Sequence, residues 1–198
     1  KPAQRYPNLF VAIKENLLLL AVGVVIFWGV EIVDTLLLNF LDRFGIQPRS
    51  LSGFTGILTA PFLHLGFGHL ISNTIPFLIL GGIVLLGGRR NFLMSSLIII
   101  TIGGAMLWVM GPSQTNHIGA SLLIFGYLGF ILARGIFQRS VLWIVVGVIT
   151  LVAYGGMLQG VLPGEKGVSW QGHLFGFIAG VISARVLFTR EKPVSAET

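Results

Sequence analysis

The sequence predicts an all-α membrane protein, a bundle of six transmembrane helices. Of its 198 residues, 54% are apolar and only 10% are charged, whereas a soluble domain carries about 25% charge. The charges leave long uninterrupted gaps, and a helix that crosses the ~30 Å hydrocarbon core needs about 20 residues. These runs are continuously apolar rather than alternating, which disfavours a transmembrane β-barrel. The composition excludes a soluble enzyme, a nucleic-acid-binding protein and, because there is no cysteine, a disulfide scaffold.

Each helix is predicted where an apolar run is bounded by glycine, proline, asparagine or charge. The predicted spans cover residues 16–38, 69–88, 92–110, 118–137, 140–158 and 168–188. Polar tails at about 1–15 and 191–198 flank them, and we expect residues 1–198 to form a single domain. The basic amino-terminal segment followed by an apolar run resembles a signal peptide. No small-residue cleavage site follows it, so we expect a retained first helix.

The connection between the first two spans, residues 39–68, is long enough for structure of its own. It holds Pro48, Gly53, Gly56 and Pro61 among apolar residues. This mixture predicts a partly buried, interfacial connection rather than a solvated loop.

Lysines and arginines orient the bundle, because cytoplasmic segments accumulate them. With the amino terminus inside, ten fall on the inner side and three on the outer side. The inner ten are Lys1, Arg5, Lys14, Arg89, Arg90, Arg134, Arg139, Arg185, Arg190 and Lys192, and the outer three are Arg43, Arg49 and Lys166. The second, fourth and sixth spans then begin at the outer face. We expect a multi-pass protein of a bacterial cell membrane, with its amino terminus in the cytoplasm and the lipid bilayer around it.

Polar side chains recur at the outer starts of those three spans. His69 and Asn73 are four residues apart, so both project from one face of the second span. Ser121 opens the fourth span and His173 opens the sixth. Each alone is more typical of helix packing than of catalysis, but together they predict one polar layer.

The inner arginines serve as depth markers for this layer. Ser121 lies 13 residues before Arg134 and His173 lies 12 before Arg185. At ~1.5 Å per residue the two side chains stand at nearly equal depth. Asn73 stands about one turn nearer the outer surface.

Small residues give the fourth and sixth spans a means of close approach. Such a ridge lets two helices pack backbone to backbone, which would bring His173 toward Ser121. The sixth span carries Gly172, Gly176, Gly180 and Ala184, and the fourth carries Gly126, Gly129 and Ala133.

These residues suit acyl transfer. A serine hydroxyl needs a base within ~2.6–3.2 Å, and His173 is the best candidate because its imidazole is a base near neutral pH. The developing oxyanion needs preorganised donors worth roughly 2.7–4 kcal/mol each; Asn73, His69 and the backbone N–H of Ser121 could supply them. No carboxylate lies in the second, fourth or sixth span, so the prediction is a Ser/His dyad without a cofactor. His117 is an alternative to His173 as the base that takes the proton of the Ser121 hydroxyl.

A metal hydrolase is a further alternative, since the chain has four histidines, of which His64 is the one not yet named. There is no His-Glu-x-x-His pattern and no cysteine, so we expect no metal.

The motifs closely resemble the rhomboid intramembrane serine proteases from about residue 50 to 188. They comprise Thr59-Ala60-Pro61-Phe62-Leu63-His64, Phe67-Gly68-His69 with Asn73, Gly119-Ala120-Ser121 with Phe125-Gly126, and Gly172-His173 with Gly176 and Gly180. The resemblance implies a six-helix rhomboid-like bundle, Ser121 as nucleophile, His173 as base, and His69 and Asn73 assisting the oxyanion. It also implies transmembrane protein substrates, cleaved near the outer face in a water-filled cavity.

Two departures from the family pattern stand out. The family usually has Gly-x-Ser-Gly, but Leu122 follows Ser121 here, and its Cβ could crowd the substrate carbonyl or alter the oxyanion site. The first outer connection has Phe54-Thr55-Gly56 in place of the family's Trp-Arg pair. The first departure leaves open a pseudoprotease that binds membrane proteins without cutting them. A transporter fits the hydrophobicity, but the chain shows neither repeated halves nor mid-span carboxylates.

Overall fold

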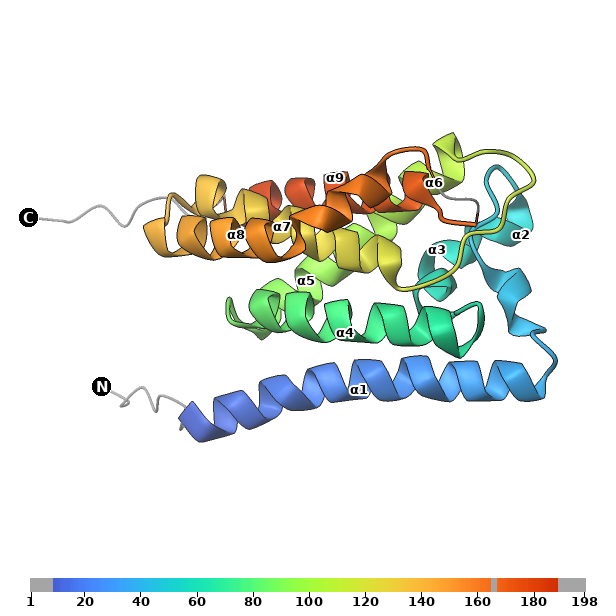
Figure 1. The fold of residues 1–198 in the computed structure, drawn as a ribbon, viewed down its shortest axis with the longest axis horizontal. Helices are drawn as coiled ribbons and strands as arrows, with labels where there is room; N and C mark the ends of the chain where they lie inside the picture. Colours follow the sequence, from blue (N-terminus) through green and yellow to red (C-terminus); the bar gives the residue numbers. More distant parts are fainter. Residues whose placement is uncertain (1–8, 165–166, 189–198) are drawn as a thin grey trace, which may run out of the picture.

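The computed structural model describes residues 9–164 and 167–188 and shows an all-helical bundle (Figure 1). Six of its helical segments are long and apolar enough to cross a membrane, which confirms the predicted fold class. No strand occurs within these residues; one isolated bridge pairs Ile46 with His117. The six segments are α1 (Leu9–Leu36), α4 (Gly66–Leu85), α5 (Arg89–Ile98) continued by a π-helical turn (Ile99–Gly103) into α6 (Gly104–Met110), α7 (Ser121–Gln138), α8 (Val141–Tyr154) with a 3₁₀ extension (Gly155–Val161), and α9 (Trp170–Phe188).

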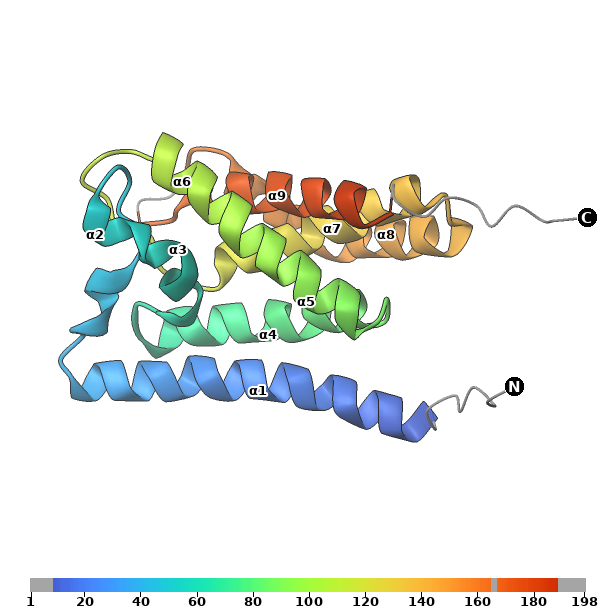
Figure 2. The same ribbon diagram turned by 180° about the vertical axis from the view of Figure 1, so that it is seen from behind.

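Helix α1 lies at the edge of the bundle beside α4, as both ribbon views show (Figures 1 and 2). It begins at Leu9 rather than at residue 16, so part of the expected amino-terminal tail is helical. The Trp28 Nε1–H donates to Thr74 Oγ1 on α4 at 3.3 Å. The remaining tail residues, 1–8 and 189–198, lie outside the described residues.

The connection from α1 to α4 consists of short helices packed against the bundle. They are η1 (Leu41–Phe44), α2 (Leu51–Phe54), α3 (Gly56–Thr59) and η2 (Ala60–Phe62). A Cβ on Gly56 would lie 2.2 Å from the carbonyl oxygen of Gly45, and Thr59 Oγ1 donates to the Phe44 carbonyl at 2.6 Å. Gly53, Gly56 and Pro61 are buried whereas Leu51 is exposed, so the segment is partly buried, as predicted.

Helix α7 is the core of the molecule, because its large side chains, such as Tyr127 and Phe130, are fully buried. Helix α9 crosses it backbone to backbone. A Cβ on Gly176 would lie 2.1 Å from the Leu122 carbonyl oxygen, and one on Gly180 would lie 1.9 Å from that of Gly126. Real Cβ atoms do not approach this closely, so this crossing needs glycine. The predicted close packing of the fourth and sixth spans is confirmed.

The glycines of α7 have different neighbours. A Cβ on Gly129 would lie 2.3 Å from the Phe177 carbonyl oxygen of α9, as the predicted groove requires. A Cβ on Gly126 would instead meet the Ile99 side chain at 2.3 Å. Gly126 therefore leaves room for Ile99 of the third span at its Cα, while its carbonyl oxygen contacts Gly180 of the sixth span.

Helices α4, α7 and α9 all begin at the end of the bundle that carries α2 and α3 (Figures 1 and 2). Three helix starts therefore share one end, where the side chains predicted to act together can meet. Arginines 89, 90, 134, 139 and 185 belong to the opposite end, in or beside the last turns of α4, α7 and α9.

Candidate active site

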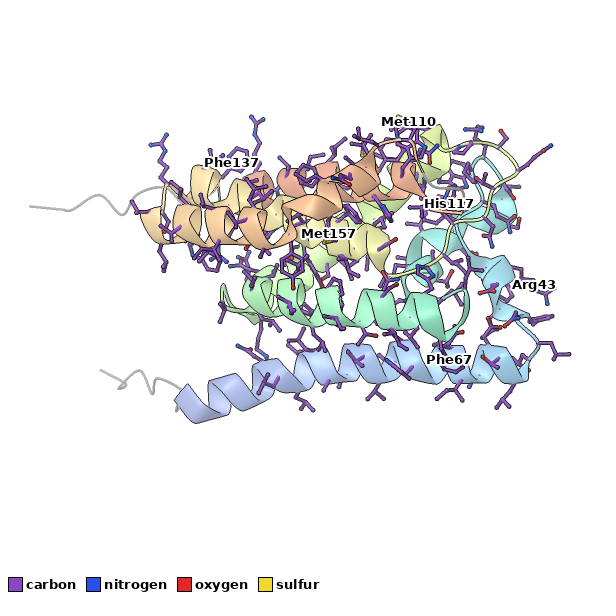
Figure 3. All side chains as sticks on the ribbon, viewed as in Figure 1. Arg43, Phe67, Met110, His117, Phe137 and Met157 are labelled. Carbon is purple, nitrogen blue, oxygen red and sulfur yellow. The ribbon has the colours of Figure 1, made fainter. Side chains whose placement is uncertain are left out.

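A cavity of about 650 Å³ opens where α4, α7 and α9 begin. All four side chains predicted to act together line it: His69, Asn73, Ser121 and His173. Its wall also includes His117 and Met157, which are labelled in Figure 3. The cavity combines polar groups from three helices with apolar walls, which is the usual composition of a small-molecule or peptide site.

Ser121 is the first residue of α7, and the glycine two residues before it fixes this start. Gly119 adopts φ +116°, a left-handed backbone conformation that favours glycine. Its N–H donates to the Ala60 carbonyl at 2.9 Å, and a Cβ there would lie 2.6 Å from Cε1 of His69. The tight turn therefore brings the His69 ring against the chain beside Ser121. Backbone N–H groups in the first turn of a helix have no intrahelical acceptor, so the Ser121 N–H is a candidate donor.

His173 lies in the first turn of α9, and its ring is held on two sides. Its Nδ1 is 2.9 Å from the Gly160 carbonyl oxygen. Because a carbonyl can only accept, Nδ1 carries the proton and Nε2 keeps its lone pair. The ring stacks on Phe125 of α7, with centroids 4.0 Å apart and planes 8° apart. A buried imidazole held in this tautomer can serve as a base through Nε2.

The Ser121 hydroxyl and the His173 ring face the same cavity, but within the described chain no hydrogen bond joins them. Catalytic hydrogen bonds are often long in unliganded enzymes and shorten when substrate binds. The structure thus brings the two groups into one cavity without forming the dyad contact.

His69 and Asn73 present donors from α4. The Leu65 N–H donates to His69 Nδ1 at 3.3 Å, so Nε2 carries the proton of the neutral ring. Asn73 is 5% exposed, and its Nδ2 donates to the His69 carbonyl at 2.9 Å. An amide nitrogen carries two protons, so one is left for the cavity.

Comparison with protein families matches residues 52–190 to the rhomboid domain. The chain belongs to the rhomboid family. Uncharacterized protein Rv1337 of Mycobacterium tuberculosis is 42% identical to this rhomboid over 181 residues, covering 87% of this chain and 75% of the relative. Uncharacterized protein ML1171 of Mycobacterium leprae is 42% identical over 175 residues, covering 84% and 69%. "Putative rhomboid protease YdcA" of Bacillus subtilis is 28% identical over 133 residues, covering 64% and 63%.

Leu122, the departure from the usual rhomboid motif, does not line the large cavity. Its side chain is 7% exposed, and its Cδ2 lies 3.2 Å from where a Cβ on Gly103 would be. Gly103 ends the π-helical turn between α5 and α6. Leu107, Ser121 and Leu122 all line a second hollow of about 20 Å³. Leu122 thus packs between helices on the side of Ser121 that borders the small hollow, and its effect on a bound substrate stays a prediction.

Both ring nitrogens of His117, the competing base, are engaged by other partners in this rhomboid. Nε2 is 2.7 Å from Thr115 Oγ1 and Nδ1 is 2.7 Å from Ser169 Oγ. Burial lowers the pKa of this imidazole below its ordinary value. Sequence reasoning missed Ser169, which also lines the cavity; its place four residues before His173 was the available signal.

The remaining histidine, His64, and the acidic residues Glu31, Asp34 and Asp42 do not line this cavity. His64 is 1% exposed, its ring packs 5.5 Å from Phe27 and 5.4 Å from His69, and burial lowers its pKa to about 4. Glu31 and Asp34 are buried on α1. Among the side chains that the structure describes, no three His, Cys, Asp or Glu are grouped as metal ligands would be.

Proposed function

We propose that this rhomboid is an intramembrane serine endopeptidase that acts through Ser121 and His173. The observation that carries the proposal is the tautomer of His173: its Nδ1–H is held by the Gly160 carbonyl, which leaves Nε2 as a base in the cavity that Ser121 also lines. Membership of the rhomboid family and the name of the Bacillus relative support the same activity.

The proposed reaction has two halves. His173 Nε2 takes the proton from Ser121 Oγ as the oxygen attacks the scissile carbonyl carbon, and then gives that proton to the leaving amine as the C–N bond breaks. Water then attacks the acyl-enzyme, losing its proton to His173, which returns it to Ser121 Oγ. Products are a free amine and a carboxylic acid.

The oxyanion that forms in each half needs donors fixed in advance. The proposed donors are the N–H groups of His69 Nε2, Asn73 Nδ2 and the Ser121 backbone, each worth roughly 2.7–4 kcal/mol. His69 is oriented by the bond that its opposite nitrogen, Nδ1, accepts from Leu65, and Asn73 by the bond that the other proton of its Nδ2 donates to the His69 carbonyl. This preorganisation is what such donors need, because no reorganisation then accompanies the reaction.

The proposed substrates are transmembrane proteins, and the proposed orientation opens the cavity outward. Arginines at the end of the bundle away from Ser121 favour the cytoplasm for that end, so the amino terminus would also be cytoplasmic. A helical peptide bond must unwind before Ser121 can reach it, because its polar groups are paired and its carbonyl is shielded. Substrates should therefore have small or helix-weakening residues near their outer ends.

The first prediction concerns Ser121. In detergent or liposomes, the wild type should cleave a helix-destabilised transmembrane substrate and react with a fluorophosphonate probe. Ser121→Ala should lose both, and His173→Ala should lose both to a similar extent because the two groups act as a unit. The control is Ser52→Ala, at a serine of α2 that does not line the cavity. Equal cleavage by the wild type and Ser121→Ala would overturn the proposal.

A pseudoprotease is the second candidate, favoured by Leu122 and by the missing contact between Ser121 and His173 in the described structure. In that case a transmembrane protein should co-purify with the chain while the probe leaves Ser121 unlabelled. Labelling of Ser121 would exclude this candidate.

A further inference from the structure

A directional chain of hydrogen bonds passes through His117. Thr115 Oγ1 donates to the Pro112 carbonyl at 2.7 Å, so toward His117 it accepts, and His117 Nε2 carries the proton. Nδ1 of the neutral ring is then an acceptor, and the Ser169 hydroxyl donates to it at 2.7 Å. Ser169 Oγ in turn accepts from the Gly172 N–H at 3.1 Å. The hydroxyls of Thr115 and Ser169 each donate one hydrogen bond and accept one, and both ring nitrogens of His117 have a partner.

Ser169, at one end of this series of hydrogen bonds, caps the amino terminus of helix α9. Besides the bond to Gly172, the Ser169 carbonyl accepts the N–H of His173 at 3.1 Å. A Cβ on Gly172 would lie 2.7 Å from Ser169 Oγ, so glycine permits the close contact. Ser169 therefore fixes the turn of α9 that carries the proposed base.

The other end of the chain is anchored beside the proposed nucleophile. His117 exchanges two backbone hydrogen bonds with Ile46, both of 2.9 Å. Two residues later, Gly119 bonds to Ala60, and Ser121 follows as the start of α7. The His117 backbone is thus held by the α1–α4 connection while its side chain, 9% exposed, reaches across to α9.

We infer that His117 is a positioning residue: its bond to Ser169 holds the first turn of α9 against the segment that leads into α7, and so sets the separation of His173 from Ser121. This inference rests on the proposed function. Deeper in the bundle Gly176 and Gly180 join α9 to α7 by packing alone. At the open end, the His117–Ser169 bond supplies a polar link.

Two substitutions of nearly equal size separate positioning from space filling. In His117→Asn the amide oxygen overlaps the position of Nδ1 and can accept from Ser169. In His117→Gln the amide overlaps the position of Nε2 and reaches Thr115 instead. We expect His117→Gln and His117→Ala to lower kcat and the rate of probe labelling about 10- to 100-fold, with KM within about twofold. His117→Asn should stay within about fivefold of wild type. Equal losses in the Asn and Gln variants would overturn the inference.

The Ser169→Ala variant tests the bond from its other side. Combined with His117→Ala, it should lower kcat no further than Ser169→Ala alone, because both changes remove the same link. Multiplicative losses would overturn the inference. Labelling of Ser169 by the probe in Ser121→Ala would also overturn it, since Ser169 and His117 would then be a nucleophile and its base.

Amide hydrogen exchange tests the link without using catalysis. In His117→Gln the amides of Gly172 and His173 should exchange at least tenfold faster than in the wild type, whereas those of residues 179–184 should be unchanged. His117→Asn should restore the slow exchange. Unchanged exchange at Gly172 and His173 would overturn the inference. If Ser121→Ala kept full activity, the proposed function would fail, and exchange would still report on the link.

Discussion

At position 122 a leucine follows the proposed nucleophile, where rhomboids usually carry glycine. The sequence suggested that its side chain could obstruct the site. In the structure the side chain packs against Gly103 at the π-helical turn of the third span. A π-helical turn inserts one residue into a helix, and here the turn ends with a glycine that leaves room for the leucine. The larger side chain at position 122 is thus accommodated by the missing side chain of Gly103 in the third span.

The prediction at the residue scale is that Leu122→Gly removes packing rather than an obstacle. The variant leaves a hole beside Gly103, and emptying a buried leucine site commonly costs about 2–5 kcal/mol. Thermal unfolding in detergent should shift to lower temperature, while probe labelling of Ser121, measured well below that transition, should stay within about threefold of wild type. A large gain in labelling would favour the pseudoprotease, with Leu122 as the block.

At the scale of elements, the crossing of α7 and α9 decides whether Ser121 and His173 can meet. Membrane helices lack a hydrophobic drive toward one another, so their association depends on van der Waals packing and hydrogen bonds. The approach of Gly176 and Gly180 to α7 carbonyls supplies that packing. The stacking of His173 on Phe125 then joins the same two helices at the site.

The prediction for this crossing uses Gly180→Val. Its Cβ would lie 1.9 Å from the Gly126 carbonyl oxygen, which is backbone and cannot rotate aside. The helices must separate, at a cost of at least about 1–3 kcal/mol, so both the unfolding temperature and the labelling of Ser121 should fall. The matched control is Gly82→Ala on α4, where the nearest atom is 3.8 Å away. Wild-type labelling in Gly180→Val would show that the crossing does not position the dyad.

At the scale of the whole molecule, α1 packs against α4, and its carboxyl-terminal end carries Asp34, which lies near Asp42 of η1. Asp34 Oδ1 accepts the Leu41 N–H at 2.6 Å, which ties α1 to η1. Burial, and next the negative charge of Asp34, raise the pKa of Asp42 to about 6 from its ordinary 3.8. Folding therefore stabilises the neutral form of the Asp42 carboxyl relative to its ionised form, compared with the unfolded chain.

This shift predicts a pH dependence of stability. Between pH of about 4 and 6 the folded state binds the Asp42 proton and the unfolded state does not, so this group lowers the free energy of unfolding as the pH rises. His64, with its pKa lowered to about 4, acts in the opposite direction over the same window. The readout is therefore the unfolding temperature of Asp42→Asn minus that of wild type. This difference should grow from pH 4 to 6 and then level off; a difference independent of pH would contradict the assignment.

Hydrophobicity and residue counts along the chain were enough to predict the six membrane spans and the side chains that share one depth. Insertion into lipid depends on local hydrophobicity and helix length, and depth follows from residue counts along straight helices, so both can be read without tertiary contacts. Ser121 and His173, placed at one depth by counting from Arg134 and Arg185, do line one cavity. Helix ends were less accurate: α4 runs over Gly66–Leu85, where the predicted span was 69–88.

The hydrogen-bond and packing partners of the side chains at that depth depend on tertiary contacts. Gly160 fixes the tautomer of His173 from 13 residues away, and Ser169 engages His117 across 52 residues. Gly103 receives Leu122 from a different span. Such partners are chosen by where helices cross and where loops return. The physical reason is that hydrogen bonding and steric fit depend on distances of a few ångströms, which hydrophobic periodicity does not encode.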